Sequence, residues 1–354
     1  MKLFHPLTLR GITLRNRIGV SPMCQYSAVD GLPSHWHLVH LGSRAVGGAG
    51  LVIAEASAVA PEGRISPADT GLWNEAQAEA WAPITRFIRE AGAVPGIQLA
   101  HAGRKASTDL PWRGGKPLAP EAGGWSPVVS ASALAFAESH PVPQSLSQTD
   151  IAGVVAAFGR AARLAREAGF EFLEIHAAHG YLLHQFLSPL SNWREDAYGG
   201  SLDGRMRLTL EVIAAVRREW PERLPLSLRL SATDWAESGG WDLEQSIELV
   251  RRAMALVVDV IDVSSGGSLP NVRIPVGPGF QVPFARRIRE ETGAVTAAVG
   301  LISDPAQAQQ IISTGDADLV LLGREFLRDP YWPQRAARAL GARIEAPLQY
   351  QRAL

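Results

Sequence analysis

Two histidines and a tyrosine lie close together in the segment His176-Ala177-Ala178-His179-Gly180-Tyr181. Imidazoles three residues apart can ligate a metal ion, or they can present two N–H donors to a carbonyl oxygen that gains negative charge. A metal needs further ligands, and although Glu174 precedes His176 by two residues, no similar set follows the other predicted strands. We therefore favour the donor pair, with a metal site and a purely structural polar pair as the alternatives.

The phenol of Tyr181 is a candidate proton donor to a carbon atom because it lies in the same segment as this donor pair. The alternative is a packed aromatic ring whose hydroxyl is satisfied by a neighbour.

Other polar or special residues follow other short apolar runs. Gln98 and Arg229 are suited to hydrogen-bond a planar ring rich in acceptors, and a cation at the edge of such a ring would stabilise its anionic reduced form. The alternative for Arg229 is a buried ion pair with a carboxylate. Gly300 and Gly323 have no side chain that would keep a ligand from the backbone N–H groups, and the guanidinium of Arg324 can donate two hydrogen bonds. Together they suit a phosphate group. The alternative there is a turn glycine beside an arginine that faces solvent.

The elements that carry these residues alternate regularly along the chain. Eight apolar runs predict strands at Arg17–Ser21, Leu51–Ala56, Gly96–Ala100, Phe172–His176, Leu226–Leu230, Val258–Val263, Val295–Val299 and Leu319–Leu322. Helical spacing of apolar residues predicts helices at His35–Val46, Ala76–Ala91, Ile151–Ala168, Arg205–Trp220, Leu243–Leu256, Val282–Glu291, Pro305–Thr314 and Pro330–Ala339.

Eight strand–helix units predict an α/β protein with a (β/α)8 TIM barrel that forms a single domain over residues 1–354. An open doubly wound sheet is the alternative, but no glycine-rich dinucleotide fingerprint follows the first strand. In a barrel, the carboxyl ends of the strands surround one pocket. The polar residues that follow the strands are therefore expected to form one catalytic centre.

Two segments lie outside this repeat. Residues 7–15 alternate around Gly11 and predict an N-terminal β-hairpin that caps the bottom of the barrel. Residues 107–147 are rich in proline, glycine and tryptophan and show little periodicity. This long loop after the third strand is expected at the top of the barrel as an active-site loop or lid.

Composition excludes several classes of function. With 34 basic and 35 acidic residues, the chain has no basic field that would favour nucleic acid or an anionic membrane as a partner. Cys24 is the single cysteine, so neither an intrachain disulfide nor a cysteine-ligated iron–sulfur cluster can form; its thiol is either reactive or a small buried side chain. No apolar run reaches the length of about 18 residues that a membrane span requires, and the first residues lack the apolar core of a signal peptide. We expect a cytoplasmic protein.

Several longer motifs together resemble the Old Yellow Enzyme family of FMN-dependent ene-reductases, over essentially the whole chain. They are LFHPLTLRGITLRNRIGVSPMCQYS, EASAVAPEGR, GIQLAHAGRKA, LRLSATD, LVLLGREFLRDPYW and, most specific, HAAHGYLLHQFLSP followed by N-x-R-x-D-x-Y-G-G-S. The variant SPMCQYS is similar to the subgroup that includes the YqjM-like and xenobiotic-reductase-like enzymes.

The resemblance implies roles for individual residues. It places paired carbonyl-binding donors at His176 and His179, the proton donor at Tyr181, and a lysine near the cofactor at Lys105. It also implies a substrate contact at Tyr26, and an arginine at Arg352 that reaches the substrate site of a neighbouring subunit. Cys24 would tune the flavin potential. The implied flavin-binding residues are Ser21, Pro22, Met23, Cys24, Ala56, Gln98, Arg229, Gly300, Gly323 and Arg324.

The implied activity is ping-pong reduction of activated C=C bonds in small-molecule enones and enals. NADPH or NADH would reduce bound FMN, and hydride would pass from flavin N5 to the β-carbon of the substrate. A homodimer or homotetramer is implied as well. Three alternatives stay open: another FMN barrel such as a dihydroorotate dehydrogenase or a 2,4-dienoyl-CoA reductase, a metal-dependent hydrolase that uses His176 and His179, and a ligand-binding barrel without catalytic activity.

Overall fold

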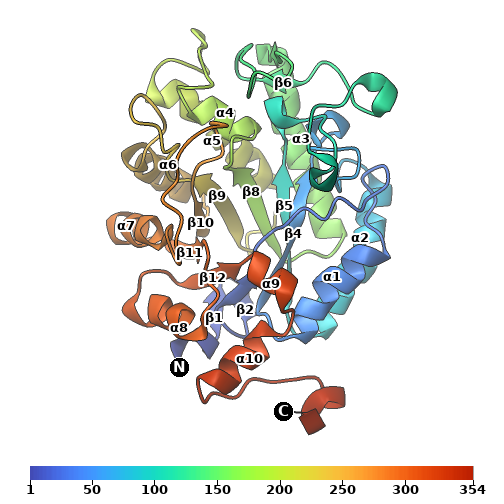
Figure 1. Cartoon of the computed structure of the whole chain (residues 1–354), viewed down its shortest axis with the longest axis vertical. Coiled ribbons are helices and arrows are strands. Elements are labelled where there is room, and N and C mark those ends of the chain that lie inside the picture. The colour runs from blue at the N-terminus through green and yellow to red at the C-terminus, as the bar shows by residue number, and fades with distance from the viewer. Residues whose placement is uncertain (354) are drawn as a thin grey trace.

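Eight parallel strands close into a barrel in the computed structural model, which describes residues 1–353 (Figure 1). Each predicted strand coincides with an observed one, so the TIM-barrel prediction is confirmed and the open sheet is wrong. Each strand pairs with the next one named, and the last pairs with the first. In this order they are β3 (Ile18–Val20), β4 (Leu51–Ala58), β5 (Val94–Ala100), β8 (Phe172–Ala177), β9 (Leu226–Ser231), β10 (Val260–Ser264), β11 (Val295–Val299) and β12 (Leu319–Leu322).

The outer layer of helices follows the predicted pattern. Its main members are α1 (His35–Val46), α2 (Glu75–Glu90), α3 (Gln148–Glu167), α5 (Leu202–Glu219), α6 (Leu243–Ala255), α7 (Val282–Thr292), α8 (Pro305–Thr314) and α10 (Trp332–Ala339). Side-chain caps fix several of their starts, for example Ser34 before α1 and Asp304 before Pro305 of α8. Two further helices, α4 (Leu182–Leu187) and α9 (Arg324–Arg328), are too short to show periodicity in the sequence.

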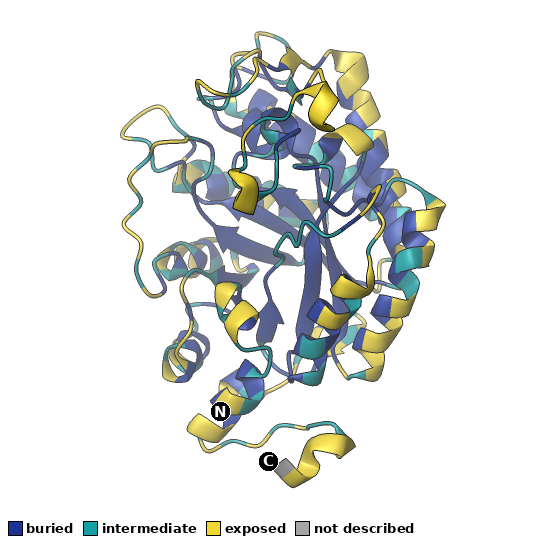
Figure 2. Ribbon diagram, turned by 45° about the vertical axis from the view of Figure 1, so that its right-hand side comes forward, coloured by how far each residue is buried: buried dark blue, intermediate teal, exposed yellow. Residues whose placement is uncertain are grey.

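The strands are buried on both faces (Figure 2). Val52 and Ile97 belong to the apolar layer beneath the helices, whereas Leu51 and Phe172 belong to a second cluster formed mainly by strand residues. The hairpin of β1 (Leu7–Leu9) and β2 (Ile12–Leu14) packs into this second cluster and caps the barrel at the lower end in Figure 1, as predicted.

Residues 107–147 cross the opposite end of the barrel. They contain little regular structure besides two short strands, β6 (Val129–Ser130) and β7 (Gln144–Ser145). The Trp112 ring packs edge-on against Tyr26 at 5.9 Å, and Trp125 Nε1 donates to the Glu62 carbonyl at 3.1 Å. The loop therefore lies at the carboxyl-terminal end of the barrel, where the polar residues follow the strands. None of the helices within residues 1–353 has both the length and the apolar character that crossing a bilayer demands.

Candidate functional site

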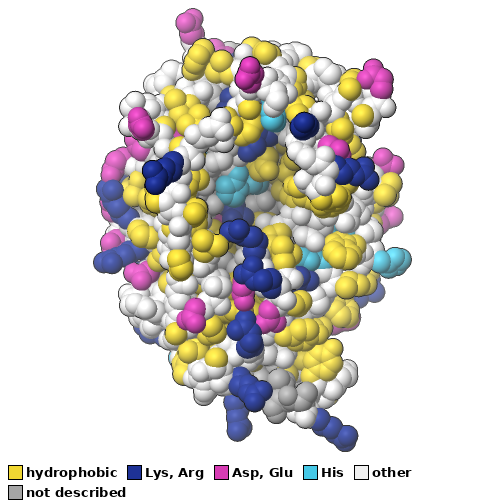
Figure 3. Space-filling model, in the orientation of Figure 1, with side chains coloured by type: hydrophobic (Ala, Val, Ile, Leu, Met, Phe, Trp, Pro, Cys, Tyr) yellow, Lys and Arg dark blue, Asp and Glu magenta, His cyan; other side chains and the backbone are white. Residues whose placement is uncertain are grey.

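Strand register brings the predicted site residues together at the carboxyl ends of the barrel strands. Ala56 pairs with Gln98 across β4 and β5, and His176 pairs with Arg229 across β8 and β9. Ser21 follows β3 directly, and its N–H donates to the Leu322 carbonyl of β12 at 3.0 Å. Figure 3 shows a hollow near the middle of this face, with a histidine visible inside it and basic side chains below it.

His176, His179 and Tyr181 form one aromatic cluster. The ring of His176 lies 5.1 Å from that of His179 and 5.0 Å from that of Tyr181, in both cases close to perpendicular. Burial and the charge of Arg229 lower the pKa of both histidines well below the ordinary value, so both imidazoles are neutral at pH 7. Burial raises the pKa of Tyr181, so its phenol keeps its proton. The cluster thus offers neutral N–H and O–H donors.

Hydrogen bonds to the ring nitrogens decide which of them can donate. His176 Nδ1 accepts from the Ala178 N–H at 3.4 Å, which leaves the proton on Nε2. His179 Nε2 lies 2.7 Å from Ser264 Oγ at the end of β10. Strand β10 therefore supplies a partner that orients His179.

Lys105 binds the turn that carries His179. Its Nζ donates to the His179 carbonyl at 2.9 Å and to the Gly267 carbonyl at 3.1 Å, and it lies 5.1 Å from the centre of the Tyr181 ring. Burial, together with Arg104, lowers the pKa of Lys105 to about 8.

The barrel interior below this cluster holds an acidic pair. Arg229 Nε lies 3.1 Å from Asp262 Oδ2, so the buried ion pair weighed as an alternative for Arg229 is present. Gln98 Nε2 donates to Glu174 Oε1 at 2.8 Å, and Ser227 Oγ donates to Glu174 Oε2 at 3.0 Å. Burial raises the pKa of both carboxyl groups, while Arg229 acts against this shift. Glu174 is thus engaged by these donors instead of joining His176 in a ligand set.

The segment after β3 forms another wall of the site. Burial raises the pKa of the Cys24 thiol, and Asp69 and Glu55 add to the effect, which disfavours a reactive thiolate. Burial likewise raises the pKa of Tyr26. The Gln25 N–H donates to Glu55 Oε2 at 2.9 Å and so fixes this segment against β4.

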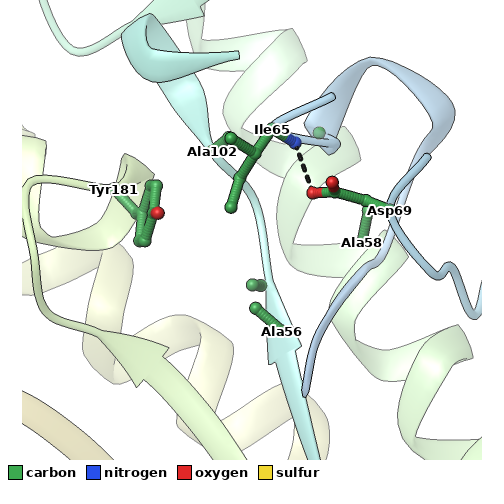
Figure 4. Close-up of a pocket in the computed structure, with 8 residues that line it drawn as sticks. Ala56, Ala58, Ile65, Asp69, Ala102 and Tyr181 are labelled. Atoms are coloured by element: carbon green, nitrogen blue, oxygen red, sulfur yellow. Dashed lines mark hydrogen bonds between the residues drawn. The ribbon is translucent and has the colours of Figure 1, made fainter. Parts of the chain in front are cut away.

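A small cavity of about 10 Å³, enough for roughly one water molecule, lies between Tyr181 and Asp69 (Figure 4). Asp69 accepts hydrogen bonds from the Ile65 N–H at 2.8 Å and from Ser66 Oγ at 2.6 Å. Because it is buried, its pKa is raised to about 7.

Among the predicted phosphate-binding residues, Gly323 presents open backbone, whereas a Cβ on Gly300 would lie 2.9 Å from Gln281 Nε2. A Cβ added to Gly323 would meet nothing closer than Met23 Sδ at 3.6 Å, and Gly300 has a φ of +124° that favours glycine. Arg324 begins α9, is exposed, and forms no ion pair with another residue in the described part of the chain. Gly323 and Arg324 are therefore accessible from solvent.

Neither the expected role of Arg352 nor the alternative of a metal site finds support within one chain. Arg352 lies exposed in the last turn (Leu348–Ala353), at the lower end in Figure 1 and away from the mouth of its own barrel. Among residues 1–353, no cluster of three or more histidine, cysteine, aspartate or glutamate side chains has the geometry of a metal site.

Sequence reasoning missed the residues that support the cluster from behind. Ser264 directly follows the sixth predicted strand, and this position alone is a signal that it borders the site. Ser231 accepts from the His179 N–H at 3.0 Å, while His184 and Asp234 form a buried pair 3.0 Å apart. These three residues lie within the motifs LRLSATD and HAAHGYLLHQFLSP, but the motifs alone do not say what their side chains contact.

Comparisons with known proteins identify the family of the chain. The chain matches the sequence model described as the NADH:flavin oxidoreductase / NADH oxidase family over residues 2–342. The NADPH dehydrogenase of Geobacillus thermodenitrificans is 48% identical over 352 residues, covering 99% of this chain and 98% of the relative. That of Bacillus subtilis is 45% identical over 353 residues, with 99% and 98% covered.

Solved structures show the same fold. A structure of morphinone reductase superimposes with a TM-score of 0.78 at 28% identity, covering 98% of this chain and 91% of that one. A 2-naphthoyl-CoA reductase superimposes with a TM-score of 0.86 at 24% identity, covering 96% of this chain and 52% of that one, a likeness of fold alone.

Proposed function

The chain belongs to the NADH:flavin oxidoreductase / NADH oxidase family and is an Old Yellow Enzyme-type oxidoreductase, and from that premise we propose that it is an FMN-dependent ene-reductase. It would use NAD(P)H to reduce the activated C=C bond of α,β-unsaturated carbonyl compounds. The observation that carries the proposal is the cluster of His176, His179 and Tyr181, in which the His176 ring lies 5.1 and 5.0 Å from the other two rings.

The residues at the barrel mouth fit FMN. Gln98 and Arg229 lie on the strand ends where a flat ring rich in acceptors would lie, and Cys24 is on the segment that follows β3. Gly323 offers an anion open backbone, and the exposed Arg324 offers a guanidinium without a carboxylate partner in the described chain. Gly300, with its positive φ, completes the proposed set. The remaining residues proposed to contact FMN are Ser21, Pro22, Met23 and Ala56. When bound, FMN supplies the chemistry of accepting and passing on a hydride.

The protein side of the reaction is binding of a carbonyl and delivery of a proton. His176 and His179 would hydrogen-bond the carbonyl oxygen and stabilise the negative charge that develops on it; one oriented donor of this kind is worth roughly 2.7–4 kcal/mol. Neutral imidazoles suit this task because they donate without becoming acids that compete with Tyr181. Tyr181, whose raised pKa keeps it protonated, would then protonate the α-carbon.

We also propose two structural roles at the edges of the site. The contact of Trp112 with Tyr26 supports residues 107–147 as a lid beside a substrate contact. The exposure of Arg352 away from its own barrel mouth supports a homodimer or homotetramer in which it reaches a neighbour's site.

The test is an absorption spectrum of the purified protein, before and after anaerobic NADPH and then 2-cyclohexenone. The proposal predicts flavin absorbance that bleaches with NADPH and returns with the enone. His176→Ala should slow the return far more than the bleaching, whereas His5→Ala, an exposed histidine near the other end of the barrel, should alter neither. Equal losses in both phases for His176→Ala would refute the carbonyl-binding role, and a colourless protein that FMN does not reconstitute would refute the cofactor.

A further inference from the structure

The turn between His176 and Tyr181 is held by side chains at its backbone. The Gly180 N–H donates to His184 Nδ1 at 2.9 Å, and the Gly180 carbonyl accepts from Gln185 Nε2 at 2.7 Å. His179 has a φ of +58°, a left-handed conformation that a residue with a side chain adopts only at a cost. The turn that aims the donor cluster thus depends on supports from the first turn of α4.

Behind His184 lies Asp234, in the loop after β9. His184 Nε2 is 3.0 Å from Asp234 Oδ1, and neither side chain is exposed to solvent. Within residues 1–353 neither of these two atoms has another polar partner. Asp234 Oδ2 accepts from Ser188 Oγ at 2.5 Å and from the Trp241 N–H at 2.9 Å. Burial opposes ionisation of Asp234, but its contacts with His184, Ser188 and Trp241 lower its pKa below the ordinary value.

These contacts determine the tautomer of His184. Because Nδ1 accepts from the Gly180 N–H, it carries no proton, and the ring proton must be on Nε2. There it faces the carboxylate of Asp234, which is an acceptor only. Because the carboxylate of Asp234 favours the proton on Nε2, Nδ1 stays unprotonated and accepts the hydrogen bond from the Gly180 N–H.

We propose that His184 and Asp234 are positioning residues: the buried pair fixes the turn at Gly180 and thereby the aim of His179 and Tyr181. The functional part of this inference rests on the proposed roles of those two residues. His184 and Asp234 lie behind the turn and hold its backbone, so they act on the reaction only through its geometry.

Asp234→Asn gives the sharpest perturbation because it keeps shape and volume. Ser188 and the Trp241 N–H both donate to one oxygen, so the amide oxygen of asparagine takes that place and its NH2 group faces His184 Nε2. A donor there favours the tautomer with the proton on Nδ1, which then meets the Gly180 N–H, donor against donor. The turn must shift.

The experiment uses the flavin-loaded enzyme. Long-range ¹H–¹⁵N spectra of histidine-labelled protein should show the Nε2–H tautomer for His184 in the wild type and the Nδ1–H tautomer in Asp234→Asn. Hydrogen exchange of the peptide that contains Gly180 should become faster. The kcat/KM for 2-cyclohexenone should fall on the order of 100-fold, as for a misplacement of about 1 Å, with flavin reduction by NADPH much less affected.

Two further variants separate positioning from general destabilisation. His184→Asn offers an amide oxygen to the Gly180 N–H and should retain more enone activity than His184→Ala. Thr85→Val removes a buried hydrogen bond to the Ala168 carbonyl between α2 and the end of α3, and should leave the His184 tautomer and enone kcat/KM unchanged.

The Nδ1–H tautomer in the wild type would overturn the proposal even if no variant folds. An unchanged kcat/KM in Asp234→Asn despite a changed tautomer would overturn it too, as would an equal loss in Thr85→Val. The tautomer and exchange measurements need no turnover. If the wild type fails to reduce enones, the proposed function falls while the effect of the pair on the turn is still decided.

Discussion

Ser264→Ala tests whether His179 donates to the substrate through Nδ1. Ser264 Oγ lies 2.7 Å from His179 Nε2 and 3.3 Å from Gln281 Oε1. The Ser264 hydroxyl has two acceptors within reach, His179 Nε2 and Gln281 Oε1, and the Gln281 oxygen also accepts from Ser265 Oγ at 2.6 Å. We predict that Ser264 donates its proton to His179, which is the shorter of its two contacts. With that assignment Nε2 accepts and the ring proton is on Nδ1, available to a carbonyl oxygen; if Ser264 donates to Gln281 instead, Nε2 carries the proton.

The size of the effect follows from what the substitution removes. Losing one hydrogen bond that orients a neutral ring costs about 0.5–1.5 kcal/mol, or roughly 2- to 10-fold in kcat/KM for the enone. Removing the donor itself, in His179→Ala, should cost roughly 2.7–4 kcal/mol, or about 100- to 1,000-fold. Ser264→Ala should therefore lie clearly between the wild type and His179→Ala.

The assay is stopped-flow reoxidation of the reduced flavin by 2-cyclohexenone, with reduction by NADPH measured separately. Ser265→Ala is the matched control, because this neighbouring hydroxyl contacts Gln281 and not His179. Wild-type reoxidation in Ser264→Ala, or an equal loss in Ser265→Ala, would refute the assignment of the Nδ1 proton to His179.

Three shorter predictions concern stability and the flavin. Gly180→Ala should lower the melting temperature by several degrees, because Gly180 has a φ of +72° and its new Cβ would lie 2.2 Å from the Gly267 carbonyl oxygen; calorimetry with no such drop would contradict the tight turn. The pKa of Asp69 is raised to about 7, above its unfolded value, so the folded state retains this proton longer and wild-type stability should fall as pH rises from 4 to 7. Asp69→Asn should flatten this part of the curve, and parallel curves from urea unfolding would argue against the shift. Cys24→Ala should keep the flavin bound but shift its midpoint potential; an unchanged potential would remove the tuning role.

The barrel was predictable because each strand is a short run of apolar residues and each helix has apolar residues at helical spacing. The buried strands of a parallel barrel read as continuous apolar segments, as in Leu319–Leu322, and caps such as Asp304-Pro305 mark where helices begin. The hairpin at residues 7–15 was also predictable from the sequence, since apolar and polar residues alternate around Gly11. Boundaries shifted by only a few residues because fraying ends carry weak signals.

The donor cluster was predictable as well, because its members lie within one short segment. Its supports were not, since they come from other strands and loops: Ser264 ends β10 and Asp234 follows β9. A serine or an aspartate after a strand is common, and only the closed barrel shows which ring nitrogen or amide it meets. The ion pair of Arg229 with Asp262 shows the same limit, since strand register alone placed the two side by side.

The arrangement of charge explains why the cluster acts through neutral donors. Two cations lie near the hollow, but Arg229 has its Nε beside Asp262, and Lys105 donates to the carbonyls of His179 and Gly267. Burial is the main cause that lowers the pKa of the two histidines, and the charge of Arg229 adds to it. Burial also raises the pKa of Tyr181, so that its phenol keeps its proton. Negative charge that develops on a bound carbonyl oxygen would therefore be stabilised by oriented dipoles and not by a titrating cation. On this reasoning, the rate of enone reduction depends on the orientation of His176, His179 and Tyr181, and that orientation depends on the turn at Gly180.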